Sequence, residues 1–91
     1  MLRITEIYEG DKTVTLRLDG RVVSTRVSEL EKLCIHYRDE KNKTVVLDFG
    51  GVSFIDGNGV KILESIRDER VKITNCSPFI RSLLHDLITN R

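Results

Sequence analysis

The sequence is poor in the residues that build metal and disulfide sites. Its 91 residues include two cysteines, Cys34 and Cys76, and two histidines, His36 and His85. None of these four residues shows the spacing of a zinc site, so we expect no structural metal. The two cysteines fit reduced, partly buried thiols, because disulfides are rare in reducing compartments.

Long apolar runs and an excess of either charge are also missing. No run approaches the roughly 18–20 apolar residues that cross a bilayer. The N-terminus is charged early and lacks the apolar region of a signal peptide, so we expect a cytoplasmic protein. Lys and Arg total 15 against 14 Asp and Glu, a net charge of +1. That balance argues against a nucleic-acid or anionic-membrane surface.

Catalytic and nucleotide-binding patterns are absent as well. Neither histidine lies near a plausible nucleophile, and the sequence has no phosphate-binding loop of the G-x-x-x-x-G-K-[ST] kind and no dinucleotide fingerprint. We therefore expect a protein that is not an enzyme and that binds no cofactor.

What the sequence does contain is a succession of strand and helix patterns. Residues 2–8 and 14–18 alternate apolar and polar side chains around a turn at 9–12, which predicts a β-hairpin. The period then changes to three or four residues, which predicts an amphipathic helix. Ser24 or Thr25 can serve as its N-cap, or Ser28 with Glu31 can form a capping box that starts the helix one turn later. The apolar residues of this helix are Val23, Val27, Leu30, Leu33, Cys34 and Tyr37.

A second half follows a solvated loop at 39–43. Residues 44–49 show no alternation, which predicts a strand buried on both faces. Residues 71–74 form another short strand, and Ser77-Pro78 is a typical helix start with serine as the N-cap. The stripe of that last helix is Phe79, Ile80, Leu83, Leu84 and Leu87. Strands alternating with helices predict one α/β domain over residues 1–91, in which a mixed sheet of about four strands packs with three helices.

The centre of the chain is a glycine-rich stretch between a strand and a helix. A glycine pair follows Phe49, then a short apolar piece at 52–55, then Asp56-Gly57-Asn58-Gly59. A helix-spaced pattern of Val60, Leu63 and Ile66 comes next, so a helix is predicted to begin at this turn. The first N–H groups of a helix lack intrahelical partners and can meet acceptor groups of a ligand or a protein.

These residues resemble the STAS domain family. The family typically shows an apolar strand, an "l-s-x-V-x-x-I-D" segment, then Ser or Thr, a small residue and Gly before a helix. Residues 46–60, VLDFGGVSFIDGNGV, fit that pattern. The resemblance extends to Leu18-Asp19-Gly20-Arg21 and to Asn75-Cys76-Ser77-Pro78, and it covers roughly residues 12–87. It implies a STAS fold and a protein-binding role like that of anti-sigma factor antagonists.

The sequence departs from the family at one position. In the antagonists, the residue directly after the motif Asp is a Ser or Thr that a partner kinase phosphorylates, which switches off binding to that partner. Here that position is Gly57, which has no hydroxyl, and Asn58 cannot accept a phosphate either. The resemblance therefore implies a partner surface at Asp56, Gly57, Asn58, Gly59 and Lys61, but no phosphorylation switch at Gly57. Lys61 and Glu64 are expected on the exposed side of the helix behind the contact loop.

The resemblance leaves the partner open. One partner would be an anti-sigma factor or related switch kinase. The alternative is the ATPase of a membrane transport complex, with this chain as an accessory subunit. Oligomeric state stays open too.

Several residues of the motif also have plain structural explanations. The Asp56 carboxylate is expected to fix the turn by accepting N–H groups at the helix start. Gly57 and Gly59 are explained by a positive φ or by close approach of another backbone. The turn also resembles the start of a calcium loop, but the later ligands of that loop are missing. Asp48 is expected to be structural. Ser53, the nearest hydroxyl to Gly57, is expected to be buried rather than phosphorylated.

Overall fold

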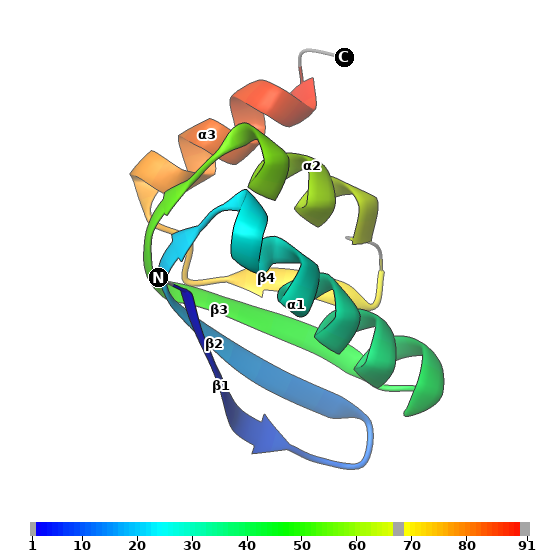
Figure 1. Cartoon of the computed structure of the whole chain (residues 1–91). Helices are drawn as coiled ribbons and strands as arrows, with labels where there is room; N and C mark the ends of the chain where they lie inside the picture. The colour runs from blue at the N-terminus through cyan, green and yellow to red at the C-terminus, as the bar shows by residue number, and fades with distance from the viewer. Residues whose placement is uncertain (1, 67–68, 90–91) are drawn as a thin grey trace.

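The computed structural model describes residues 2–66 and 69–89 of the chain. These residues form strands and helices in the predicted order (Figure 1). The elements are β1 (Leu2–Glu9), β2 (Thr13–Val22), α1 (Ser24–Ile35), a π-helix η1 (His36–Glu40), β3 (Thr44–Ile55), α2 (Gly57–Ile66), β4 (Val71–Thr74) and α3 (Pro78–Thr89).

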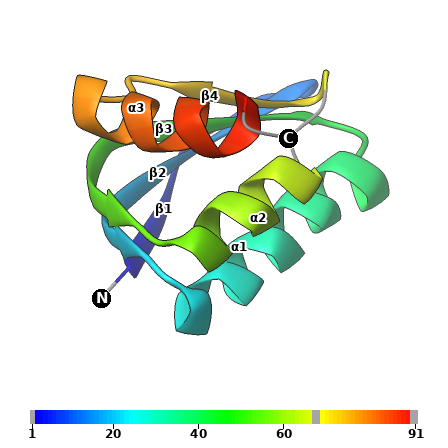
Figure 2. The ribbon, with the colours of Figure 1, turned by 90° about the horizontal axis from the view of Figure 1, so that it is seen from above.

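The sheet is mixed, as the sequence predicted. Its strand order is β1-β2-β3-β4, with β1 antiparallel to β2 and the other neighbours parallel. Figures 1 and 2 together show α1, α2 and α3 on the same side of this sheet. Each parallel connection advances by one strand in the same direction, and right-handed crossovers of that kind place their helices on one face.

The core therefore lies on one face of the sheet, which makes the prediction of a doubly buried strand wrong. In β3, Val45, Leu47 and Phe49 point into the core and are at most 1% exposed. Thr44 and Val46, on the opposite face, are half-buried, and Val46 does not join the core cluster. The lack of alternation in the sequence reflects a valine on the uncovered face, not a second layer of helices.

β3 is also longer than predicted, because the glycine pair lies inside it. Arg17 pairs with Asp48 but Asp19 pairs with Gly51, so β3 carries an extra residue there. A Cβ on Gly51 would stand 1.8 Å from Asp19 Oδ1 and 2.9 Å from the Leu18 carbonyl oxygen. Glycine thus lets the bulged strand approach β2, and the strand continues to Ile55.

The helix ends differ from the predictions in part. α1 begins at Ser24 with Val23 at the N-cap and no side-chain cap, so the predicted capping by Ser24 or Thr25 is wrong. The strand β2 runs to Val22, which leaves a single residue between strand and helix. At α3 the predicted cap is confirmed, since the Ile80 N–H donates to Ser77 Oγ at 3.2 Å. Phe79, predicted in the apolar stripe of α3, is 57% exposed; the side chain of Leu87 lies outside the described residues.

The C-terminal end of α2 is hydrogen-bonded to the π-helix η1. Arg38 Nη1 donates to the carbonyl oxygen of Ile66, the last residue of α2, at 3.1 Å. Glu9 of β1 pairs with Lys43 and Lys41, and the bond from Lys43, followed by that from Lys41, lowers the pKa of its carboxyl. The predicted loop at 39–43 is thus partly helical, with Asp39 and Glu40 in η1. The bond from Arg38 thus joins the C-terminal end of α2 to η1.

Candidate partner-binding turn

Asp56 joins the end of β3 to the start of α2 and caps the helix. Its Oδ1 accepts the N–H of Gly59 at 2.7 Å, and its carbonyl oxygen accepts the N–H of Val60 at 3.0 Å. The N–H of Asp56 donates to the Val22 carbonyl oxygen at 3.2 Å, which ties the turn to the end of β2. A carboxylate at this position satisfies an otherwise unpartnered N–H and interacts favourably with the helix dipole. The structural role that the sequence indicated for Asp56 agrees with these bonds.

The two glycines of the turn are there for different reasons. A Cβ on Gly59 would lie 2.6 Å from the Val22 carbonyl oxygen and 2.9 Å from Ile55 Cγ1. A Cβ on Gly57 would meet no atom within 4 Å. Neither glycine has a positive φ. Close backbone approach therefore requires glycine at position 59, whereas no steric feature requires it at position 57.

The predicted surface residues come together on the first turns of α2. Gly57, Asn58 and Lys61 are exposed and Asp56 is half-buried. Gly59 is buried beneath them, so it supports the turn rather than forming its outer surface. Glu64, predicted on the exposed side of the helix, is half-buried, whereas the predicted exposure of Lys61 is confirmed.

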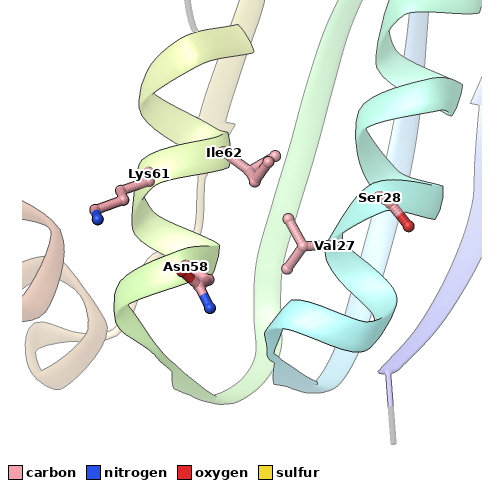
Figure 3. A pocket seen from close by; sticks show the side chains of 5 residues that line it. All are labelled: Val27, Ser28, Asn58, Lys61 and Ile62. Atoms are coloured by element: carbon pink, nitrogen blue, oxygen red, sulfur yellow. The ribbon is translucent and has the colours of Figure 1, made fainter.

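A groove beside the turn was not predicted from the sequence. It has a volume of about 330 Å³ and is lined by Val27 and Ser28 of α1 and by Asn58, Lys61 and Ile62 of α2 (Figure 3). One residue of the sequence could have indicated the groove. Ile62 is apolar but lies outside the buried stripe of α2, which is formed by Val60, Leu63 and Ile66. An apolar side chain off the buried stripe points to a second apolar contact of the helix.

Asp48 is a structural residue, as predicted. Its Oδ1 accepts the N–H of Gly50 at 2.8 Å and Nδ2 of Asn75 at 3.2 Å. The bond from Gly50, followed by that from Asn75 and the charge of Arg17, holds the pKa of the Asp48 carboxyl below its ordinary value. This carboxylate, 8% exposed, joins the β3 bulge to the loop after β4.

Ser53 does not fit its prediction. It is exposed, although the sequence placed it in a buried apolar segment. The register shifts again here, since Gly20 pairs with Val52 and Arg21 with Phe54, so Ser53 is the extra residue of β3. Residues at such irregularities lose their strict alternation, which explains the error.

No group of three or more His, Cys, Asp or Glu side chains in residues 2–66 and 69–89 could hold a metal ion. None of the helices in the same part of the chain is long and apolar enough to cross a bilayer.

The mixed sheet, its helices on one face and the capped turn at the end of β3 define a small α/β domain with an exposed helix start. The STAS domain model matches residues 4–89, so the chain belongs to the STAS domain family.

Solved structures share this fold. The anti-sigma factor antagonist SpoIIAA in its unphosphorylated form has a TM-score of 0.66 and 22% identity, over 93% of this chain and 82% of that one. The Bacillus cell fate determinant SpoIIAA in its phosphorylated form has a TM-score of 0.70 and 20% identity, over 94% and 82%. A crystal structure of Mglu has a TM-score of 0.64 and 24% identity over 77% of this chain, which spans 19% of that protein. A comparison with curated protein sequences gave no match.

Proposed function

We propose that this STAS domain is a protein-binding regulatory module that contacts its partner through Asp56, Gly57, Asn58 and Lys61. The observation that supports it best is the first turn of α2, which is capped and fixed at its base yet exposed at its outer residues. The similarity to SpoIIAA, an anti-sigma factor antagonist, suggests a partner of the anti-sigma factor or switch-kinase class.

We further propose that this module has no phosphorylation switch at position 57. One of the similar structures is a phosphorylated form, so the fold accommodates such a modification. Here the position that matches the family's phosphoacceptor is a glycine with open space around it. The fold therefore does not require glycine at position 57 for steric reasons, and the missing hydroxyl is a chemical difference from the family pattern. Binding to the partner is expected not to respond to a kinase at this position.

A non-enzymatic role fits the polar groups of the domain. The buried carboxylate, Asp48, is held by the Gly50 N–H and Asn75. The capping carboxylate, Asp56, accepts the N–H of Gly59. Both side chains accept backbone N–H groups and so serve the fold. The absence of a cofactor and the location in the cytoplasm remain predictions.

The contact surface can be tested by blocking it without disturbing the fold. In Gly57→Trp the new Cβ meets no neighbour, so the variant is expected to fold like the wild type while its indole covers the turn. Calorimetric titration with a purified switch kinase of the anti-sigma factor class should show binding to the wild type and at least about tenfold weaker binding to this variant. Lys72→Glu, an exposed change on β4, is the control and should bind normally.

Two results would contradict the proposal. One is equal affinity of the wild type and Gly57→Trp for the kinase, with both proteins folded. The other is co-purification of the chain with an ATPase and a permease and no kinase, which would support a role as an accessory subunit of a transport complex.

A further inference from the structure

The groove between α1 and α2 is apolar at its floor and polar at its rim. Figure 3 shows Val27 and Ile62 pointing toward one another between the two helices. Val27 is 1% exposed and belongs to the core, and Ile62 is half-buried and packs against it. Ser28 and Asn58 are exposed at the edges. The volume, about 330 Å³, is at the lower end of the range for small-ligand pockets.

Lys61 supplies the charge beside this groove. It is the single charged residue among the five that line it. It is exposed, and it forms no ion pair within residues 2–66 and 69–89. In Figure 3 its side chain extends outward from α2, on the side away from α1. The first turns of α2 therefore carry the apolar groove on the side that faces α1 and the ammonium group of Lys61 on the opposite side.

We propose that this groove takes an apolar side chain from an acidic helical segment of the partner protein, a proposal that rests on the function given above. The segment crosses the first turns of α2, inserts an apolar side chain between Val27 and Ile62, and places a carboxylate against Lys61. A helix suits this arrangement, because residues three or four apart share one face and can present the two groups together. Lys61 is the one charged residue of the lining, so a carboxylate gains an ion pair there and an ammonium group does not.

The probes are three matched peptides rather than the partner itself. Each is about 14 residues long, since shorter isolated helices are marginal in water. The first carries Leu and Glu four positions apart on one face of a neutral helix. The second has Lys in place of that Glu, and the third has Ser in place of that Leu. Each is titrated into the ¹⁵N-labelled full chain at low salt, where exposed ion pairs are least screened.

We expect a defined pattern of amide shifts and affinities in these titrations. The Leu/Glu peptide should shift the amides of Val27, Ser28, Asn58, Lys61 and Ile62. The Lys peptide should bind the wild type about two- to fivefold more weakly, the effect of one exposed ion pair. Lys61→Glu should reverse that preference, and Lys72→Glu should leave it unchanged. Ser28→Trp, which places an indole at the rim from an exposed position, should abolish binding of all three peptides.

Several outcomes would overturn the proposal. They are shifts centred elsewhere on the domain, equal affinities for the Glu and Lys peptides, and a Ser peptide that binds as well as the Leu peptide. Absence of any shift at about 5 mM peptide would overturn it too, because the affinity would then lie below that of a weak specific contact.

The same variants separate this proposal from the broader one. If Gly57→Trp weakens binding of the switch kinase but Lys61→Glu and Ser28→Trp do not, the turn is the contact site and the groove is not. If none of the three weakens it, the proposed function itself fails.

Discussion

The bulge inside β3 and the turn that follows β3 are both built from an aspartate and glycines, but the bulge holds the sheet together and the turn forms a surface. Asp48 and the glycines after it form a bulge inside the sheet, and Asp56 with Gly57 and Gly59 forms the turn at its end. In both, an aspartate accepts a glycine N–H close by in sequence. Asp48 is also held by Asn75 and is 8% exposed, whereas the outer residues of the turn are open to solvent. The surroundings of an Asp-Gly segment, not its composition, make it scaffold or surface.

The largest expected effect comes from adding a methyl group inside the turn. Gly59→Ala places a Cβ 2.6 Å from a backbone carbonyl oxygen that cannot move away cheaply. Overpacking of this kind costs about 1–3 kcal/mol, and we expect the upper part of that range. Urea unfolding followed by circular dichroism measures the loss.

Gly57→Ala is the matched control for that variant. It makes the same change two residues away on the same helix, where the new Cβ meets nothing. Alanine is the better helix former, so the free energy of unfolding should stay level or rise by up to about 1 kcal/mol. Equal losses in the two variants would mean that the turn is not divided into a packed and an open glycine.

The second-largest loss of stability is expected when the charge of Asp48, the carboxylate at the β3 bulge, is removed. Asp48→Asn keeps an oxygen for the Gly50 N–H but removes the charge, so we expect a loss of about 1–2 kcal/mol at neutral pH. Because folding lowers the pKa of this carboxyl below its ordinary value of 3.8, the wild type gains stability above that value. The gain disappears as pH falls through the lower folded-state pKa.

The pH dependence distinguishes this role from a simple packing role. The unfolding curves of wild type and Asp48→Asn, measured between neutral pH and strong acid, should converge in acid. A difference that stays constant over the whole range would show that the charge of Asp48 contributes nothing to stability.

The smallest structural effect is expected at the turn's own carboxylate. Asp56→Ala removes the cap of α2 and should cost about 1 kcal/mol, whereas Asp56→Ser keeps a capping oxygen and should restore most of it. If the alanine and serine variants destabilise the domain equally in thermal unfolding, the bond to the Gly59 N–H contributes nothing to its stability.

Much of the fold could be predicted from the sequence. The hairpin, three helices and parallel strands came from apolar periodicity, and Ser77 as a cap came from Ser-Pro chemistry. The continuous β3 could not be predicted, because a glycine pair indicates a break unless a neighbouring strand is known to approach it. The face exposed by Val46 was missed for a similar reason, since the order of the strands decides which faces the helices cover.

The site was predicted only in part. Residues 56–59 and 61 came from the family resemblance, and the structure places them at the residue before α2 and on the first turns of that helix. The buried position of Gly59 and the open space at Gly57 depend on where the end of β2 passes, which no local pattern reveals. The groove was missed because it needs Val27 and Ile62, two residues 35 positions apart, to meet across α1 and α2.

The central claim is a partner surface whose binding no kinase controls at position 57. It is tested most directly by measuring the affinity for a switch kinase with and without ATP, for the wild type and for Gly57→Ser. The open space at position 57 accepts the serine without strain. The wild type should bind equally well in both conditions and carry no phosphate, and the serine variant should become phosphorylated and lose affinity. Phosphate on the wild type near the turn, with ATP-dependent release of the partner, would contradict the account.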